Sequence, residues 1–381
     1  ELTRLAHEYE LDVDPDAKIE DLAVGLQQRV EILKALFKGA EVLILDEPTG
    51  VLTPAEADHL FRILGTLRDQ GKTVILITHK LREIMAITDR VSVMRRGEVV
   101  ATRETKDTTV EELAELMVGR RVLLRVEKGP SHPGETVLEV KNLTWKDRKG
   151  VPRVDNVSLT VRKGEIVGIA GVSGNGQSEL VELLSGQRPI ADGEIFIREQ
   201  RFEPKRSHFA KMKVFGLPEE PLKNATVPRM TVAENMAFRT FDQPPVTSLG
   251  WWLSPGPMRS IAKELIARYK VKTPSAETPI ENLSGGNVQR AVLARELSGE
   301  VDVLIVANPC FGLDFASVAE IRAQIMEQRN RGAAVLLVSE DLDEILELAD
   351  RVAVMSEGKI NYVSPVSQTD RHTIGQHMAG H

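Results

Sequence analysis

Short runs of consecutive apolar residues recur along this chain and predict buried strands. Residues 42–45 and 74–77 are such runs, and residues 166–170 and 333–338 have the same character. Runs of this length without alternation are typical of central parallel strands that are covered on both faces. Residues 55–69 carry apolar positions at helical spacing between the first two runs, which completes a strand–helix–strand unit. The pattern therefore predicts an α/β fold.

Turn residues divide the rest of the chain into smaller elements. Residues 91–94 and 99–101 flank an Arg-Gly turn and predict a hairpin, and residues 109–117 predict a short closing helix. Residues 124–136 are rich in glycine, proline and serine and predict an interdomain linker. Residues 258–269 predict a further helix.

The chain repeats itself. LAVGLQQR at residues 22–29 returns as LSGGNVQR at residues 283–290, which is 261 positions later (283 − 22). An internal repeat at fixed register indicates two copies of one domain. The copies differ at three positions where the first copy has ionisable side chains. At this offset Asp46, Glu47 and His79 correspond to Ala307, Asn308 and Glu340.

The repeat also predicts the domain boundaries. We expect residues 1–123 to be the C-terminal part of the first copy, 124–136 the linker, 137–366 the second copy and 367–381 a frayed tail. A glycine-rich loop begins at Gly171, and its counterpart in the first copy would fall at position −90 (171 − 261). We therefore expect the first copy to lack its front and the chain to be part of a longer protein.

Residues 171–178, GVSGNGQS, follow an apolar strand and precede a helical pattern. They match the phosphate-binding loop GxxxxGK[ST], with Gln177 in place of lysine. Glycines let backbone N–H groups point at phosphates at a helix N-terminus, and Ser178 stands where a hydroxyl would ligate Mg²⁺. Gln177 offers a neutral hydrogen bond of about 1 kcal/mol but no charge, so we expect weak nucleotide binding. The alternative interpretation is an ordinary tight strand–helix turn.

Two carboxylates end the strand of residues 42–45. Asp46 is placed to hold Mg²⁺ and Glu47 to polarise an attacking water, at the strand end where open α/β sheets bind ligands. His79 ends the next strand, where it could hydrogen-bond a γ-phosphate. The alternatives are a pair of solvated loop acids and a structural histidine.

LSGGNVQR is the most specific string, because Ser284, Gly285 and Gly286 open a helix whose N-terminus can bind phosphate. Together these segments resemble the signature, Walker B, H-loop and Walker A motifs of ABC-type ATPases, over nearly the whole chain. Two fused domains with a degenerate second half resemble the ATPase subunits of simple-sugar and nucleoside importers. The resemblance implies Glu47 and His79 as catalytic residues and Asp46 and Ser178 as Mg²⁺ ligands. It implies nucleotide binding by Gly171, Gly174, Asn175, Gly176, Gln177, Ser178, Glu179, Ser284, Gly285, Gly286 and Asn287.

The same resemblance implies P-loop NTPase cores, each with a parallel central sheet, an antiparallel β subdomain and a helical subdomain, in two tandem copies of which the first is incomplete. It also implies head-to-tail pairing, in which the Walker motifs of one domain and the signature of the other hold each ATP. Under this pairing, one composite site combines the altered Walker motifs of the second domain with the signature of the first domain. That first signature is itself altered, at Ala23 and Val24. The other composite site keeps Glu47, His79 and an intact LSGGN.

The amino-acid composition and the net charge argue against some classes of function. The 42% hydrophobic and 28% charged content is typical of a soluble globular protein, and no run approaches the roughly 20 apolar residues of a membrane helix. A net charge of −7 without a basic cluster argues against nucleic-acid binding, and the lone Cys310 excludes an internal disulfide.

We therefore expect an ATP- and Mg²⁺-dependent ATPase on the cytoplasmic face of the membrane. Its partners would be transmembrane permease subunits and, indirectly, a solute-binding protein. The solute is a nucleoside or a monosaccharide, and GNGQSE with Ala307-Asn308 favours the nucleoside. The rival classes are a soluble twin-ABC protein acting on ribosomes or DNA and a non-catalytic nucleotide-binding module.

Overall fold

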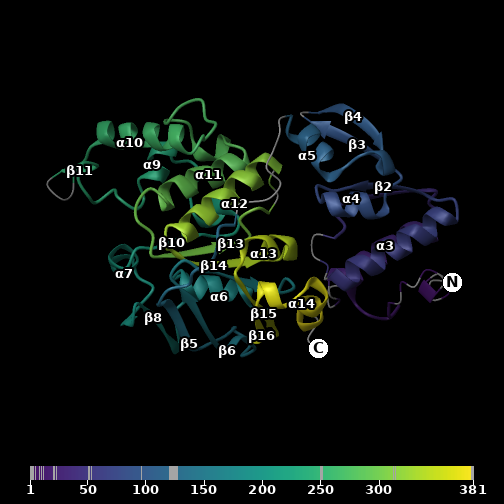
Figure 1. Cartoon of the computed structure of the whole chain (residues 1–381), viewed down its shortest axis with the longest axis horizontal. Helices are drawn as coiled ribbons and strands as arrows, with labels where there is room; N and C mark the ends of the chain where they lie inside the picture. The colour runs from purple at the N-terminus through teal and green to yellow at the C-terminus, as the bar shows by residue number, and fades with distance from the viewer. Residues whose placement is uncertain are drawn as a thin grey trace. The chain divides into compact units, whose positions relative to one another are not determined.

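A computed structural model describes most of the chain (Figure 1). The described residues are 4–378 without 5, 8, 10, 12, 20–21, 23, 50–51, 53, 96, 120–127, 249–251, 312 and 314, and only the backbone is described for 24, 25, 54, 315 and 316. The chain divides into two compact units. The first contains Glu1–Leu124 and Arg371–Ala379, and the second contains Arg125–Asp370.

The second unit is built on a six-stranded mixed sheet. Its strand order is β10 (Val214–Leu217), β13 (Val303–Ala307), β14 (Ala334–Ser339), β7 (Ile166–Ala170), β15 (Arg351–Ser356) and β16 (Lys359–Pro365). Neighbouring strands are parallel from β10 to β15, and only β16 is antiparallel to its neighbour. Every residue of β7, β13 and β14 is buried, as the unbroken apolar runs of β7 and β14 predict.

Helices and a second sheet cover the two faces of this mixed sheet (Figure 1). On one face, α6 (Gln177–Leu184) shares a core with the antiparallel sheet β6-β5-β8-β9. Those strands are β5 (Thr136–Lys146), β6 (Pro152–Arg162), β8 (Asp192–Ile197) and β9 (Gln200–Arg201). On the other face lie α12 (Phe315–Asn330) and α13 (Leu342–Leu348). A Cβ on Gly168 would lie 2.8 Å from the Ile345 side chain, so the glycine permits the close approach of α13.

A helical part completes the second unit, in the segment where the resemblance implies a helical subdomain. In it α9 (Val232–Met236), α10 (Pro255–Arg268) and α11 (Gly285–Glu296) pack together. The smaller elements are α7 (Arg206–Lys211), α8 (Pro221–Asn224), β11 (Thr247–Ser248), β12 (Trp252–Leu253) and η3 (Ile280–Asn282). Glu296 is fully buried and forms ion pairs with Arg239 and Arg295, which join α11 to the loop after α9.

The first unit contains a parallel pair of strands and a hairpin. Its elements are α2 (Val24–Phe37), β1 (Val42–Asp46), α3 (Pro54–Asp69), β2 (Thr73–Ile77), α4 (Leu81–Ile87), β3 (Arg90–Arg95), β4 (Glu98–Glu104), η2 (Thr105–Asp107) and α5 (Val110–Val118). β1 is parallel to β2, and β3 is antiparallel to β4. These elements confirm the predicted strand–helix–strand unit, hairpin and closing helix.

The end of the chain differs from the frayed tail that we expected. η4 (Val366–Gln368) is followed by α14 (Arg371–Met378), which packs against α3 and groups with the first unit. Ile374 and Met378 lie one helical turn apart and are both buried. The helix is ordered because these two side chains form a small apolar face that can be buried. This face was not predicted because the residues around it in the sequence are polar.

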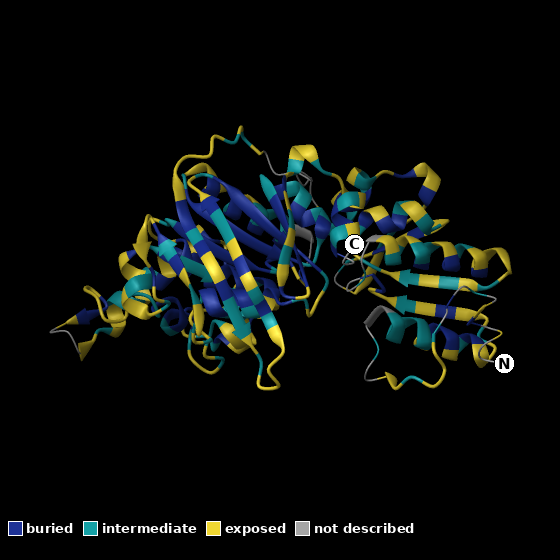
Figure 2. Cartoon of the chain, turned by 90° about the horizontal axis from the view of Figure 1, so that it is seen from below, coloured by how far each residue is buried: buried dark blue, intermediate teal, exposed yellow. Residues whose placement is uncertain are grey.

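The elements of the first unit return in the second at the same offset. β1, α3, α4, β3 and β4 have the bounds of β13, α12, α13, β15 and β16 shifted by 261 positions (303 − 42). Several strands of the second unit have no counterpart among the described residues of the first, among them β7, which lies between β14 and β15, and the strands of the antiparallel sheet β6-β5-β8-β9. Ile44 and Ile77 are 66% and 50% exposed, whereas their counterparts Ile305 and Val338 are buried in the core that they share with α6 and that antiparallel sheet. Figure 2 shows exposed residues along the two parallel strands of the first unit.

Candidate functional site

The end of β1 carries the two predicted carboxylates. Asp46 is the last residue of the strand, and Glu47 follows in the left-handed backbone region with a φ of 46°. The Glu47 N–H still donates to Ile77 O at 2.8 Å, which ties the turn to the end of β2. A positive φ is uncommon for a residue other than glycine and costs free energy, so the surrounding contacts must hold this turn.

Glu47 meets His79 across the two strand ends. Glu47 Oε1 lies 2.7 Å from His79 Nδ1 and also accepts the backbone N–H of His79 at 3.2 Å. Burial raises the pKa of the Glu47 carboxyl, but hydrogen bonds to His79 and the charges of His79 and Lys80 outweigh it, so the pKa is lowered. The carboxylate is therefore ionised at neutral pH and, at 40% exposure, is open to water.

The loop after β13 in the second unit has the same backbone conformation as the Glu47 loop but carries an amide in place of the carboxylate. Asn308 takes a φ of 43°, and its N–H donates to Val338 O at 2.8 Å. Its side-chain oxygen accepts the backbone N–H of Glu340 at 2.9 Å, as Glu47 accepts that of His79. Asn308 thus preserves the shape of the turn, but an amide cannot take a proton from water.

Glu340 stands in the place of His79. Burial raises the pKa of its carboxyl and so does the negative charge of Glu219, while a hydrogen bond from Ser173 opposes them. Ser173 belongs to the glycine-rich loop, so this carboxyl lies beside the proposed phosphate site. An ionised Glu340 would repel a phosphate there.

The glycine-rich loop has the close-packed backbone that a phosphate cradle needs. Gly176 has a φ of 102°, and a Cβ on it would lie 2.0 Å from the carbonyl oxygen of Arg153. A Cβ on Gly171 would lie 2.6 Å from Met355 O. Only glycine fits at these two positions, and α6 starts directly after Gly176. The loop therefore fits a bound phosphate chain such as that of ATP.

Side chains of the loop are engaged with its own backbone. Gln177 is buried, and its amide donates to Val172 O at 3.0 Å. Asn175 donates to the same oxygen at 3.1 Å and accepts the N–H of Glu357 at 2.8 Å. Ser178 is exposed. Gln177 would have to give up its present bond to reach a phosphate, which adds to the cost of its missing charge.

The predicted Mg²⁺ ligands do not come together within either unit. Asp46 belongs to the first unit and Ser178 to the second, where Ala307 replaces the acid. Among the residues that the structure describes, no three His, Cys, Asp or Glu side chains gather as a metal site. Of the two predicted ligands, Asp46 is the one in the first unit, and it offers a carboxylate of the kind that Mg²⁺ prefers.

The second signature segment opens a helix as predicted. α11 begins at Gly285, directly after Ser284, whose hydroxyl accepts from the Asn287 amide at 2.8 Å. Ser284 and Gly285 are exposed and Gly286 is buried. In the first unit Ala23 lies outside the described residues, and only the backbone of Val24 is described.

Sequence reasoning missed a contact that supports the Glu47 loop. The Gln28 amide on α2 donates to Pro48 O, and its counterpart Gln289 on α11 donates to Pro309 O. The signal was present, because this glutamine is identical in the two signature segments. The signature helix is thereby tied to the loop that follows β1 in the first unit and to the loop that follows β13 in the second.

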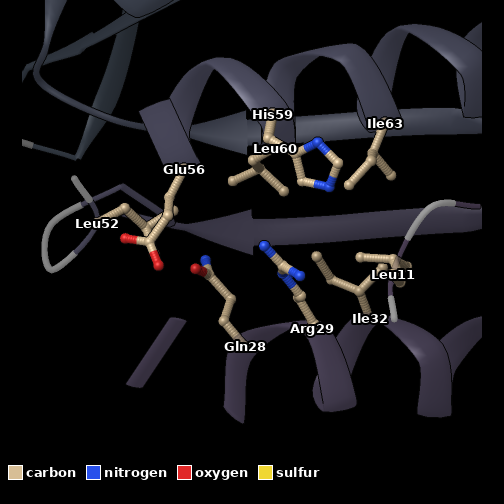
Figure 3. Close-up of a pocket in the computed structure, with 9 residues that line it drawn as sticks. All are labelled: Leu11, Gln28, Arg29, Ile32, Leu52, Glu56, His59, Leu60 and Ile63. Carbon is tan, nitrogen blue, oxygen red and sulfur yellow. The ribbon is translucent and has the colours of Figure 1, made fainter. Parts of the chain in front are cut away.

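A small pocket lies between α2 and α3 in the first unit (Figure 3). It is lined by Leu11, Gln28, Arg29, Ile32, Leu52, Glu56, His59, Leu60 and Ile63. Its volume is about 10 Å³, which is roughly the space of one water molecule. It therefore offers no room for a nucleotide.

Comparison with known proteins places these features in one family. The model of the family described as "ABC transporter" matches residues 1–50 and 154–310. The nucleoside import ATP-binding protein NupA of Lactococcus lactis subsp. cremoris is 43% identical over all of this chain and 75% of its own length. The glucose import ATP-binding protein TsgD13 of Haloferax volcanii is 43% identical over 100% of this chain and 69% of its own. The guanosine import ATP-binding protein NupO of Bacillus subtilis is 42% identical over 100% and 74%.

Solved structures show the same fold. An ATP-binding subunit of an ABC transporter matches with a TM-score of 0.53 at 18% identity, over 64% of this chain and 100% of its own. An ATP-binding cassette bound to ADP and phosphate matches with a TM-score of 0.52 at 20% identity, over 60% and 98%. Among the described helices of this chain, none is long and apolar enough to cross a membrane. From its sequence and fold together, this chain belongs to the ABC transporter family of ATPases.

Proposed function

We propose that this chain energises the import of a nucleoside or simple sugar by hydrolysing ATP while docked on a membrane permease at its cytoplasmic face. The observation that carries the proposal is the Glu47–His79 pair at the ends of β1 and β2. The relatives support the solute classes, because their names include nucleoside, guanosine, glucose, xylose and ribose import.

In this proposal each residue of the strand ends has one task. The ionised Glu47 carboxylate accepts a proton from the attacking water. His79 orients Glu47 through the 2.7 Å contact and presents its ring to the γ-phosphate. Asp46 holds Mg²⁺, which would neutralise the charge that develops on the phosphates.

We further propose that the chain holds two fused ABC domains and that the first lacks its front. The apolar side chains of β1 and β2, exposed here, support this, because their counterparts in the second unit are buried beneath neighbouring structure. A salt bridge supports it as well. Arg329 binds Asp350 at 2.8 Å, and Asp350 also accepts the N–H of Ile166 at the start of β7. The counterpart pair, Arg68 and Asp89 at 3.4 Å, is present at the surface of the first unit. A preceding strand and phosphate loop would complete that arrangement.

The second unit is proposed to bind ATP weakly and not to turn it over. Its glycine cradle supports binding, whereas Gln177 supplies no charge and Glu340 supplies the wrong one. Asn308 and Ala307 replace the base and the Mg²⁺ ligand. Under head-to-tail pairing these changes would leave one competent site and one degenerate site in the full protein.

The test is transport by the full-length protein with its permease in proteoliposomes. ATP inside the vesicles should drive uptake of labelled nucleosides or of labelled monosaccharides, and Glu47→Gln should abolish that uptake. The class of solute taken up identifies the substrate. Turnover of ATP by the wild type without uptake of either class would contradict the import function.

A further inference from the structure

A buried glutamate lies beneath the two loops that carry Glu47 and His79. Glu83, near the start of α4, is only 8% exposed. The hydroxyl of Thr49, two residues after Glu47, donates to Glu83 Oε1. The hydroxyl of Thr78, the residue before His79, donates to Glu83 Oε2 at 3.1 Å. One carboxylate therefore binds both loops at once.

The surroundings satisfy the charge of this carboxylate. Lys80 Nζ lies 3.7 Å from Glu83 Oε1 and within hydrogen-bond reach of Thr49, 3.3 Å from its hydroxyl and 3.4 Å from its carbonyl oxygen. The Thr78 hydroxyl also accepts the N–H of Lys80 at 3.1 Å. Burying a carboxylate without such partners costs free energy, and here the surrounding hydroxyl and ammonium groups supply the partners.

The second unit contains the same cluster with different neighbours. Ser339 donates to Glu344 Oε2 at 2.7 Å, and the Cys310 thiol hydrogen-bonds the same carboxyl. The balancing charge comes from Arg322, 3.3 Å away on α12, because Asp341 replaces the lysine. Glu344 therefore makes the same kind of contacts as Glu83, to the two corresponding loops of the second unit, although the charged residues around it differ.

We propose that Glu83 is a positioning residue for ATP hydrolysis, because by binding Thr49 and Thr78 it holds the Glu47 and His79 loops at the spacing at which those two side chains meet. The inference rests on the proposed role of Glu47 as the base. Glu47 and His79 are each roughly half exposed and come from separate loops, and both of their contacts run through the single oxygen Glu47 Oε1. Glu83 adds a buried connection between the loops that does not depend on this exposed side chain. A displacement of about 1 Å at a reacting group can cost about 100-fold in rate.

The experiment measures kcat and KM for ATP of the full-length protein with its permease. Glu83→Ala should lower kcat by about 10- to 100-fold while KM stays within about twofold. Glu83→Gln keeps one acceptor oxygen and should restore part of the loss.

Glu344→Gln is the matched control in the second unit. It cuts the equivalent cluster beneath loops that carry Asn308 and Glu340, so kcat should stay within about twofold of the wild type. Equal losses of kcat from Glu83→Gln and Glu344→Gln would show a merely structural role and overturn the proposal.

The remaining outcomes separate this inference from the proposed function. A wild-type kcat in Glu83→Ala, alongside an inactive Glu47→Gln, would overturn the positioning role alone. No turnover in the wild type would overturn both. If Glu83→Ala does not fold, Thr49→Val and Thr78→Val each remove one donor at nearly constant volume. Each should lower kcat with an unchanged circular-dichroism spectrum, and an unchanged kcat in both would also overturn the positioning role.

Discussion

Replacing Gln177 by lysine should strengthen ATP binding by the second unit. The glutamine begins α6 directly behind the glycine cradle, and its amide is occupied by Val172 O at 3.0 Å. A lysine adds a positive charge, which at about 4 Å from a phosphate charge and an effective dielectric near 20 is worth about 4 kcal/mol. Burying the ammonium offsets much of this gain. A net gain of about 1.4–2.8 kcal/mol lowers Kd by about 10- to 100-fold.

The assay is equilibrium binding of ATP to the 381-residue chain by calorimetry. Gln177→Met is the control, because it has a similar length and supplies neither a charge nor the amide bond to Val172. It should bind no more tightly than the wild type. An unchanged Kd in Gln177→Lys, or the same gain in Gln177→Met, would refute the reasoning that the loop holds phosphates and lacks only charge.

Three further predictions follow from the same contacts. ATP binding by the second unit should tighten as the pH falls, because burial raises the pKa of Glu340 and its protonated form no longer repels phosphate; Glu340→Gln should bind more tightly at neutral pH and lose this dependence. The 381-residue chain alone should hydrolyse ATP negligibly in a phosphate-release assay, and turnover abolished by Glu47→Gln would contradict the proposal that its first domain is incomplete. Glu296→Ala should lower the free energy of unfolding by about 3–5 kcal/mol in urea, because Arg239 and Arg295 keep partly buried charges, whereas Glu300→Ala, at an exposed ion pair, should leave it nearly unchanged.

The repeat made much of the fold predictable. Once residues 22–29 and 283–290 are aligned, each strand of the first unit predicts one in the second, and the apolar runs locate them. Glu47 and His79 were predictable as neighbours, because they end consecutive parallel strands and such ends share one edge of a sheet.

The buried polar contacts were not predictable in the same way. Glu83 lies within HKLREI, which has the pattern of a solvated helix, and its burial depends on loops distant in sequence. The one signal was its identity with Glu344 where Lys80 and Arg82 become Asp341 and Asp343. The hydrogen bond from the Gln177 amide to Val172 O could not be predicted for another reason. A motif specifies residue types and does not specify side-chain conformation.

The central claim is that hydrolysis depends on the carboxylate of the first unit and not on its counterpart in the second. The direct measurement is ATP turnover by the full-length protein with its permease, compared between Glu47→Gln and Asn308→Ala. Glu47→Gln should reduce turnover by about 10²–10⁴-fold, the range for removing a positioned general base. Asn308→Ala should change it by less than about threefold, because an amide has no proton-accepting role to lose. Equal losses from the two substitutions would contradict the account.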